Sequence, residues 1–263
     1  MKNILLTISY DGTDFCGWQR QDANGVKNVR RTVQGELECA IEKLIGFETP
    51  LCGSGRTDSG VHAEGQAAHF FSPIDSFPVK NYIRALNSIL PRDIRIVNAE
   101  ERPMHFNARF NATSRVYRYF MYVGEDADAL INRFAWCIHF CPNIDALNEM
   151  AAFLKGEMDF DAFSASGDKS PSKKRYIERA QFFYERFFPS GKEALVFEIE
   201  ANAFLWKMVR SITGTLMNLA RVNAAPSAFK KVLDGKNRKD AGPTAPPTGL
   251  FLYKVNFDGI RRH

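Results

Sequence analysis

One carboxylate in this chain stands between two glycines, two residues after an arginine. It is Asp58, within the stretch Gly-Arg-Thr-Asp-Ser-Gly-Val-His-Ala that runs from Gly55 to Ala63. Glycines leave room for a large group to approach the backbone. A carboxylate on an open turn beside a fixed cation, here Arg56, can act as a nucleophile or hold a ligand. The motif therefore predicts a chemical site at Asp58, although an isolated Gly-Asp-Gly cluster is a plain turn about as often.

Two other kinds of site do not fit this stretch. Gly53-Ser54-Gly55 is not followed by Gly-Lys-Ser/Thr, and the third glycine of a dinucleotide fingerprint is missing, which excludes a phosphate loop. Asp58-Ser59-Gly60 has the residue order of aspartic proteases, whose chemistry needs two carboxylates that share a proton. The sequence has no second Asp-Ser/Thr-Gly, and Arg56 would oppose a shared proton, so this interpretation is weak.

Residues 114–122, Ser-Arg-Val-Tyr-Arg-Tyr-Phe-Met-Tyr, form a second informative stretch. On a strand, Arg115 and Tyr117 point to one face, whereas Arg118 and Tyr122 point to the other. Faces that combine arginine with aromatic rings can stack on bases and bind phosphates. Taken alone, the stretch fits cross-strand aromatic packing with arginines at the rim equally well.

The segment after Asn202 predicts a helix with one apolar arc and one basic arc. The basic arc contains Lys207, Arg210, Gly214 and Arg221. A glycine in mid-helix costs about 1 kcal/mol relative to alanine, so Gly214 indicates a close approach on that face, where a solvated face is the ordinary case. Two shorter segments also carry basic side chains: a loop at residues 169–175 and the Phe-Asn-Ala-Arg-Phe segment at residues 106–110.

Hydrophobic periodicity distributes these motifs over strands and helices. Strands are expected at residues 3–10, 66–71, 94–98, 115–123, 176–184, 195–201 and 250–257, and helices at 32–46, 79–90, 144–154 and 204–221. This mixture predicts an α+β fold of two similarly built halves around a mostly antiparallel mixed sheet, with the active cleft between them. The expected halves are residues 1–111, with the Asp58 loop, and residues 112–263, with the Tyr-Arg-Tyr strand and the basic helix.

The composition is that of an ordinary globular protein, with 263 residues of which 45% are hydrophobic and 25% charged. The net charge of +5 suits a polyanionic partner. Five cysteines without framework spacing predict reduced thiols and a cytoplasmic location. The apolar run at the amino terminus ends early and no later run is long enough for a bilayer, so neither a signal peptide nor a membrane span is expected.

Cys137-Ile138-His139-Phe140-Cys141 could suggest a metal site. On a strand, the two cysteines would lie about 13 Å apart, which is too far for the tetrahedral ligands of one zinc ion. We therefore expect a packed strand here and no metal.

Taken together, these motifs resemble those of the tRNA pseudouridine synthase A family. The resemblance covers residues 3–257 and rests on the Asp58 motif, Tyr10-Asp11-Gly12, Gly17-Trp18-Gln19-Arg20, Phe106 to Phe110, Tyr117-Arg118-Tyr119, Asn202-Ala203-Phe204, Met208-Val209-Arg210 and Gly249-Leu250-Phe251-Leu252. It implies an enzyme that converts uridines 38–40 of the tRNA anticodon stem-loop to pseudouridine. It also implies a homodimer with basic clefts for tRNA, and a reaction without metal or organic cofactor.

Carried over by position, the resemblance implies a role for individual residues. Asp58 would be the nucleophile, Tyr117 would stack on the target uracil, and Arg210 would pair with the Asp58 carboxylate. Arg56 would help to displace and hold the flipped nucleotide. The RNA contacts would come from Phe106, Asn107, Ala108, Arg109 and Phe110, and from Gly167, Asp168, Lys169, Ser170 and Pro171.

Two departures from the family pattern bear on these assignments. Ser59 stands where the family usually has alanine, and its small size predicts little effect. Lys174-Arg175-Tyr176 stands where the family usually has Val-Arg-Thr, so the RNA contacts of that loop are the weakest of the transfers.

The chemistry implied by the resemblance leaves two routes open. Asp58 can attack C1′ of the ribose, or assist loss of the base by removing a proton from C2′. The target base must first leave its stack at a cost of about a few kcal/mol, which stacking on Tyr117 would offset. An RNA-binding protein without catalysis is the alternative that the same basic and aromatic residues allow.

Overall fold

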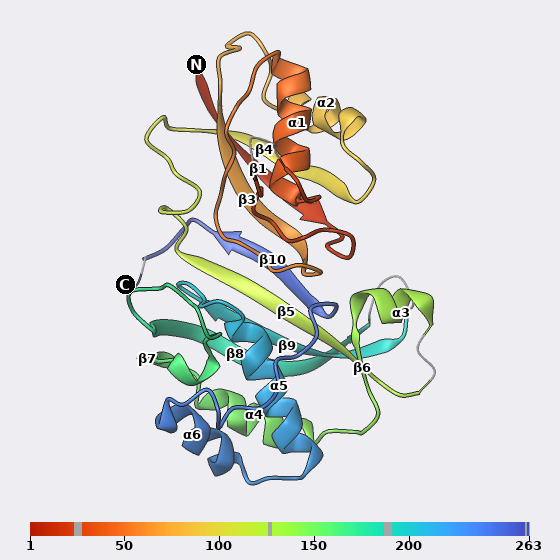
Figure 1. Ribbon diagram of the computed structural model, residues 1–263, viewed down its shortest axis with the longest axis vertical. Coiled ribbons are helices and arrows are strands. Elements are labelled where there is room, and N and C mark those ends of the chain that lie inside the picture. The colour runs from red at the N-terminus through yellow and green to blue at the C-terminus, as the bar shows by residue number, and fades with distance from the viewer. Residues whose placement is uncertain (24–27, 126–127, 187–190, 261, 263) are drawn as a thin grey trace. The chain divides into compact units, whose positions relative to one another are not determined.

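The computed structural model describes residues 1–23, 28–125, 128–186, 191–260 and 262. The chain forms two compact units (Figure 1). Unit 1 contains residues 1–113 and 251–259, and unit 2 contains residues 114–250 and 260–263. The last strand in the sequence thus lies mainly in unit 1, although the residues of unit 2 precede it.

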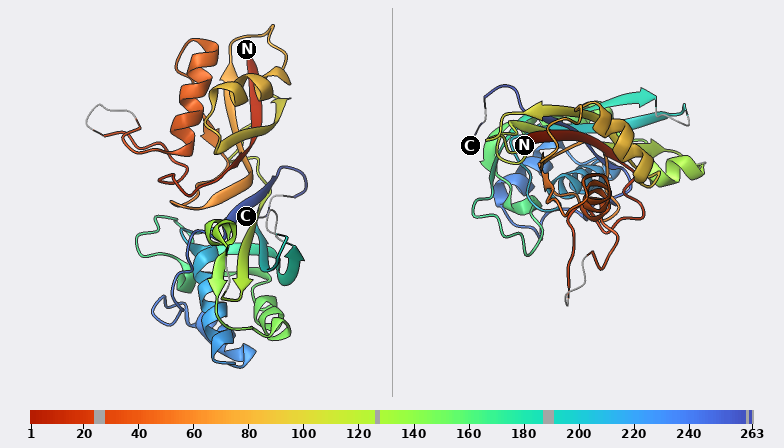
Figure 2. Two further views of the ribbon diagram at one scale, coloured as in Figure 1. Left: turned by 90° about the vertical axis from the view of Figure 1, so that its right-hand side faces the viewer. Right: turned by 90° about the horizontal axis from the view of Figure 1, so that it is seen from above.

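Unit 1 is a mixed sheet with two helices. Its elements are β1 (Lys2–Tyr10), α1 (Val33–Ile45), β2 (Cys52–Gly53), β3 (His62–Ser72), α2 (Asn81–Ile89), β4 (Ile94–Arg102) and β10 (Leu250–Asn256). The strand order is β4-β1-β3-β10, and β1 is antiparallel to both neighbours. β10 runs parallel to β3, with Phe251 opposite His62, and β2 pairs with β3. The two helices contact each other and lie on the same side of this sheet (Figure 2).

The local sequence explains where α1 begins and ends. Thr32 is its N-cap, and the threonine side chain accepts a hydrogen bond from the backbone of Gly35. Gly46 ends the helix in the left-handed conformation, which glycine adopts at little cost. Val33, Leu37 and Ile41 are fully buried on the helix face that packs into the core of unit 1.

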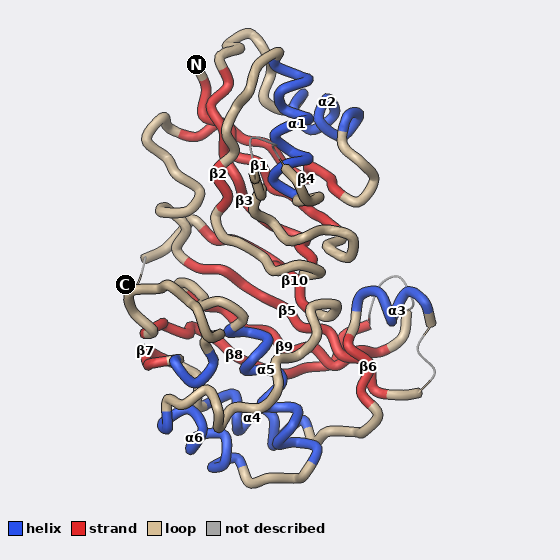
Figure 3. Tube along the Cα trace, viewed as in Figure 1, coloured by secondary structure: helices blue, strands red, loops and turns tan. Residues whose placement is uncertain are grey.

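Unit 2 combines β-strands with a cluster of helices (Figure 3). Its elements are β5 (Ser114–Val123), α3 (Ala129–Phe134), β6 (Trp136–Ile138), α4 (Ile144–Ala152), β7 (Gly156–Asp159), the 3₁₀ helix η1 (Asp161–Phe163), β8 (Lys174–Arg186), β9 (Glu193–Ala201), α5 (Met208–Arg221) and α6 (Pro226–Gly235). The strand order β5-β9-β8-β7 is antiparallel throughout, and β6 pairs parallel with β5. α4 packs on β8 and also contacts α5 and α6.

The predicted α+β class with mostly antiparallel pairing is confirmed. Two predicted elements differ from the structure. The helix expected at 204–221 begins only at Met208, because Lys207 adopts a left-handed conformation with φ of 58°. The strand expected across Cys137 to Cys141 ends at Ile138, so the strand-spacing argument against a metal does not apply to this segment. Within the residues that the structure describes, no group of three or more His, Cys, Asp or Glu side chains could hold a metal ion.

The helix α6 has no counterpart among the predicted elements. Its signals are present in the sequence: Pro226 occupies the first turn, and Phe229 and Leu233 are spaced four residues apart and buried. The membrane prediction rested on hydropathy alone. In the described part of the chain, every helix is too short or too polar to cross a membrane.

Candidate active site

The Asp58 loop connects β2 to β3 in unit 1 and is supported from below by Gln66. This glutamine is fully buried, and its amide accepts a hydrogen bond from Ser54 Oγ at 2.8 Å and donates one to the Gly55 carbonyl at 3.0 Å. The backbone N–H of Val61 donates to the carbonyl of Asp58 at 3.2 Å, which closes a turn around the carboxylate residue. Asp58 itself is half-buried. The loop therefore holds the carboxylate at the protein surface on a fixed backbone.

A second segment, residues 12–18, supports the same loop from another direction. A Cβ atom at Gly12 would lie 2.0 Å from the carbonyl oxygen of Val61, and one at Gly17 would lie 2.7 Å from that of Thr57. Only glycine allows the two backbones to approach so closely. The N–H of Trp18 donates to the Thr57 carbonyl at 3.1 Å. The Tyr10-Asp11-Gly12 and Gly17-Trp18 motifs thus fix the backbone of the Asp58 loop.

The two glycines of the Asp58 loop, Gly55 and Gly60, are explained by different features of the structure. A Cβ atom at Gly55 would meet nothing within 4 Å, so the space beside it is open. Gly60 has φ of +75°, a conformation that residues with side chains rarely adopt, and the turn requires it. The expectation of open space is met at Gly55, whereas Gly60 is explained by backbone geometry.

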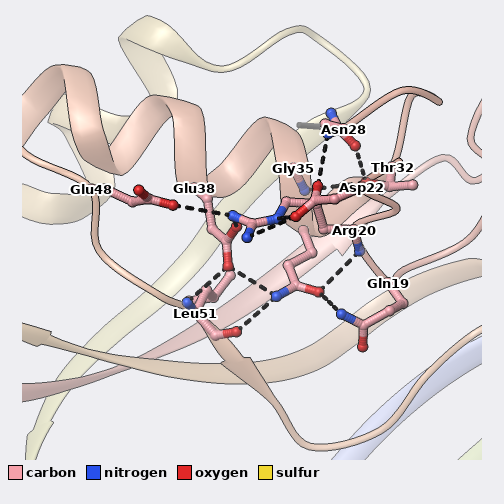
Figure 4. Close-up of polar contacts among 10 residues, drawn as sticks. Gln19, Arg20, Asp22, Asn28, Thr32, Gly35, Glu38, Glu48 and Leu51 are labelled. Atoms are coloured by element: carbon pink, nitrogen blue, oxygen red, sulfur yellow. Dashed lines mark hydrogen bonds and ion pairs between the residues drawn. The ribbon is translucent and has the colours of Figure 1, made fainter. Parts of the chain in front are cut away.

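Arg56 is positioned by a chain of side-chain hydrogen bonds that reaches α1. Its Nε donates to Gln19 Oε1 at 2.9 Å, and Gln19 Nε2 donates to Gln34 Oε1 at 2.6 Å. Gln34 Nε2 donates to Glu38 Oε1 at 2.9 Å, and Arg20 pairs with the other oxygen of Glu38. Figure 4 shows how these groups from α1 and from the segment after Trp18 converge. The exposed Arg56 is therefore linked to a buried carboxylate on a helix.

Residues 106–110 of unit 1 fall into a buried and an exposed group. Phe106 and Ala108 are buried. The N–H of Ala108 donates to His69 Nδ1 at 3.1 Å. Burial lowers the pKa of His69, and a hydrogen bond that the ring donates to the Cys52 backbone opposes this shift, so the ring is neutral and its Nδ1 can accept. These two residues are packed inside unit 1 and support the segment from within.

The exposed group consists of Arg109 and Phe110. Phe110 is 59% exposed, and the Arg109 guanidinium lies 5.7 Å from the centre of its ring. Asn107 Oδ1 accepts hydrogen bonds from the backbone N–H groups of both residues. Asn107 therefore shapes the turn that presents a cation beside an aromatic ring, a pair suited to RNA.

Tyr117 lies on β5 in unit 2 and is 9% exposed. Its ring meets the edge of Phe204 with centroids 5.0 Å apart. Arg115 donates to the carbonyl of Asn202 at 2.8 Å. Arg118 forms an ion pair at 2.8 Å with the buried Glu198, its cross-strand neighbour. Of the two interpretations of this strand, protein packing therefore accounts for both arginines.

Arg210 lies in the first turn of α5 and is locked to the loop that precedes β10. Its Nε donates to the Ala245 carbonyl at 2.8 Å, and its own carbonyl accepts from the N–H of Ala245 at 3.0 Å. Burial raises the pKa of the Tyr119 phenol strongly, and the positive charge of Arg210 opposes this shift. The same phenol donates to the Pro246 carbonyl at 2.6 Å. The guanidinium therefore has a defined position within unit 2.

The predicted close approach at Gly214 is confirmed. A Cβ atom there would lie 1.9 Å from the carbonyl oxygen of Pro243. The N–H of Gly242 donates to Thr215 Oγ1 at 2.9 Å, which ties the loop to the next residue of the helix. Around Gly214, this face of α5 is covered by residues 242–245 rather than solvated, whereas Arg221 at the end of the helix is exposed.

The loop at residues 165–173 of unit 2 is organised by Asp168. The Asp168 side chain is 5% exposed, and it accepts hydrogen bonds from Lys173 Nζ at 2.8 Å, the Ser170 N–H at 2.8 Å and the Trp206 N–H at 2.6 Å. Burial alone would raise the pKa of Asp168, but the hydrogen bonds from Lys173, Trp206 and Ser170 hold it well below its usual range. The Asp168 carboxylate thus makes its hydrogen bonds within the protein, whereas Gly167, Lys169 and Pro171 are exposed.

The sequence alone predicts no role for the three glutamines that position the site, although Gln19 belongs to a motif of the resemblance. Gln19, Gln34 and Gln66 are neutral polar residues, and neither charge nor periodicity marks them. Gln34 stands two residues after the Thr32 cap on the buried side of a helix, where a polar residue needs partners, and that was the available signal. Trp206 lies between two motifs of the resemblance, Asn202-Ala203-Phe204 and Met208-Val209-Arg210, and was given no role of its own.

Comparison with known proteins places these features in a wider context. The family described as tRNA pseudouridine synthase matches residues 6–111 and 150–258. A tRNA pseudouridine synthase A from Treponema denticola is 54% identical over 97% of this chain and 93% of its own length. Enzymes of the same name from Brachyspira hyodysenteriae and Caldicellulosiruptor bescii are 40% and 38% identical, over 98% and 97% of this chain and 99% of their own lengths.

Proposed function

Because the chain belongs to the tRNA pseudouridine synthase family, and is therefore an isomerase that forms pseudouridine in tRNA, we propose that Asp58 is its nucleophile and that its targets are uridines 38–40 of the anticodon stem-loop. The assignment of Asp58 rests on the observation that two separate parts of unit 1 hold its loop in place. Gln66 holds the loop on one side, and the close approaches at Gly12 and Gly17 hold it on the other.

The reaction breaks the bond between N1 and C1′, turns the base and joins C1′ to C5. N1 gains a proton, and the hydrogen on C5 is lost as a proton, so the product is an isomer of the substrate. Asp58 either attacks C1′ and forms an ester that C5 later displaces, or removes a proton from C2′ and assists loss of the base. Both routes need a carboxylate at a fixed position near the ribose, which a loop supported from two directions can supply.

The other proposed roles concern the flipped nucleotide. Unstacking the uridine costs about a few kcal/mol, and stacking on Tyr117 returns roughly 1–3 kcal/mol. Arg56 holds the displaced nucleotide, and Arg210 orients the Asp58 carboxylate. In this proposal residues 1–111 supply the nucleophile and residues 112–263 supply Tyr117 and Arg210.

We assign the proposed RNA contacts outside the catalytic residues to the exposed members of the predicted segments. Arg109 and Phe110 present a cation and a ring, and Lys169 presents a cation on the second loop. Phe106, Ala108 and Asp168 act by shaping those loops, because they are buried or satisfied within the protein. Contacts of this kind fix the position of the RNA rather than read its sequence.

The test uses tRNA with tritium at C5 of uridine, because bond formation at C5 releases that hydrogen. The wild-type protein is expected to release tritium from the anticodon stem-loop, whereas Asp58→Asn binds tRNA and releases none. Replacement of uridines 38–40 by cytidine removes the signal if these positions are the targets. Substantial turnover by Asp58→Asn would overturn the role of Asp58, and tRNA binding without release by the wild type would favour a non-catalytic RNA-binding protein.

Two further parts of the proposal concern the assembly and its location. We propose a homodimer in the cytoplasm, as the family resemblance implies. Sedimentation of the purified protein across a range of concentrations tests the first statement, and fractionation of cells tests the second.

A further inference from the structure

Trp206 is a large aromatic residue that the fold holds at the surface of unit 2. It is 46% exposed and lies just before α5. The other two tryptophans of the chain, Trp18 and Trp136, are buried and half-buried respectively. Tryptophan is enriched at interaction surfaces, so an exposed indole on a fixed backbone indicates a contact surface.

Both backbone polar groups of Trp206 are hydrogen-bonded within the protein. Its N–H donates to the buried carboxylate of Asp168 at 2.6 Å, and its carbonyl accepts from the N–H of Ala165 at 3.1 Å. Asp168 is in turn held by Lys173. Burying a carboxylate is costly unless its hydrogen bonds are satisfied, and here these bonds serve to hold the residue that carries the indole.

The surroundings of the ring combine a flat aromatic surface with positive charge. The Nζ of Lys207 lies 5.0 Å from the ring centre. Lys207 has φ of 58°, a left-handed conformation that is unfavourable for a residue with a side chain. Gly167 lies beside the ring, since a Cβ atom there would be 3.7 Å from Cζ3 of the indole.

We infer that Trp206 and Lys207 form a stacking platform for an unpaired nucleotide of the RNA, with the indole face against the base and the ammonium group near a phosphate. An aromatic face stacks on any base, and a cation beside it neutralises the backbone. Lys169 is also exposed, and it adds a positive charge on the loop that carries Gly167. The inference rests on the proposed function, because it takes tRNA as the ligand.

The experiment is a titration of the full-length protein with tRNA, followed by tryptophan fluorescence and by filter binding. Stacking of a base on the indole is expected to quench the fluorescence of the wild type. Trp206→Phe should keep most of the affinity and lose the quench. Trp206→Ala should weaken binding by about 5- to 140-fold, the equivalent of roughly 1–3 kcal/mol at 1.4 kcal/mol per tenfold.

Two further variants sharpen the test. Tyr184→Ala removes another exposed aromatic residue of unit 2, on β8, and should leave the dissociation constant unchanged. Lys207→Ala should reduce the salt dependence of binding by about one phosphate contact. Asp168→Asn should weaken binding in the same direction as Trp206→Ala and make the indole of the unbound protein more accessible to acrylamide.

The outcomes separate this inference from the proposed function. Tritium release with an unchanged dissociation constant for Trp206→Ala would overturn the platform and leave the function intact. Quenching that depends on Trp206 without tritium release would support the platform and contradict the isomerase reaction at the proposed positions. Loss of self-association in Trp206→Ala with unchanged tRNA binding would assign the indole to a protein interface and overturn the inference, and absence of any tRNA binding would overturn both.

Discussion

Gly17 and Gly46 have nearly the same backbone conformation but different surroundings. Their φ angles are +90° and +93°. A Cβ atom at Gly17 would lie 2.7 Å from the carbonyl oxygen of Thr57, whereas one at Gly46 would meet nothing within 4 Å. Replacing each glycine by alanine therefore separates the cost of a left-handed alanine from the cost of pushing on the Asp58 loop.

The expected magnitudes follow from these contacts. A left-handed conformation costs alanine about 1–2 kcal/mol, and the lower entropy of the unfolded alanine chain returns about 0.4–1 kcal/mol. Gly46→Ala should therefore lower the free energy of unfolding by about 1 kcal/mol. Gly17→Ala adds overpacking of roughly 1–3 kcal/mol, so its total loss should be about 2–4 kcal/mol.

The same pair of variants tests whether the segment at Gly17 positions Asp58. A displacement of about 1 Å at a reacting group can cost about 100-fold in rate. We expect Gly17→Ala to reduce tritium release from tRNA by about 10- to 100-fold under conditions where it remains folded, and Gly46→Ala to change it by less than about twofold.

Urea unfolding gives the stability of both variants, and single-turnover tritium release gives their activity. Equal losses of stability in Gly17→Ala and Gly46→Ala would refute the close approach to Thr57. A large extra loss of stability in Gly17→Ala with a wild-type rate for the folded protein would show that the segment supports the fold without positioning the Asp58 loop.

Three further predictions concern other parts of the structure. Gly214→Ala should lower the free energy of unfolding by roughly 1–3 kcal/mol despite the better helix propensity of alanine. At Gly235 the nearest atom to a Cβ lies 3.8 Å away, so Gly235→Ala should be neutral or stabilising in the same urea assay. Gln19→Ala removes the hydrogen-bond partner of Arg56 and should lower the single-turnover rate by up to about tenfold with little change in tRNA affinity, and an unchanged rate would contradict a positioning role. Burial lowers the pKa of His69 below the unfolded value of 6.5, so the unfolded chain binds more protons in acid than the folded protein does. The contribution of the neutral His69 to the free energy of unfolding is therefore present above pH 6.5 and is lost as the pH falls through the folded pKa. In urea unfolding between pH 7 and pH 5, the free energy of unfolding should fall less steeply for His69→Asn than for the wild type, because asparagine does not titrate in this range. Equal slopes for the two proteins would refute the lowered pKa of His69.

The motif at Asp58 predicted the location of the candidate site but not its support. The glycines and the carboxylate are visible in one short stretch of sequence. The hydrogen bonds that hold Arg56 run through Gln19 and Gln34, which depend on α1 and the preceding segment lying side by side. Such contacts arise from tertiary packing, and local periodicity carries no information about them.

Exposure of individual residues within a loop was equally hidden from the sequence. Asp168 and Lys169 are neighbours in a basic segment, and both were predicted to touch RNA. The structure commits Asp168 to Lys173 and to the backbone of Trp206, while Lys169 is exposed. Which of two adjacent polar residues turns inward depends on the loop conformation, and here the left-handed φ at Gly167 contributes to it.

The position of β10 has a consequence for how the protein is made. This strand pairs with β3 through Phe251 and His62, and the two rings stack with centroids 4.6 Å apart. Residues 73–249 are synthesised between β3 and β10, and they include nearly all of unit 2. During translation, the sheet of unit 1 therefore lacks one strand, and an unpaired strand edge is a site for wrong pairing. Pairing across so long a stretch of chain is slow to form, so the strand that begins four residues after Asp58 gains its last neighbour only after the helices and strands of unit 2 have been synthesised.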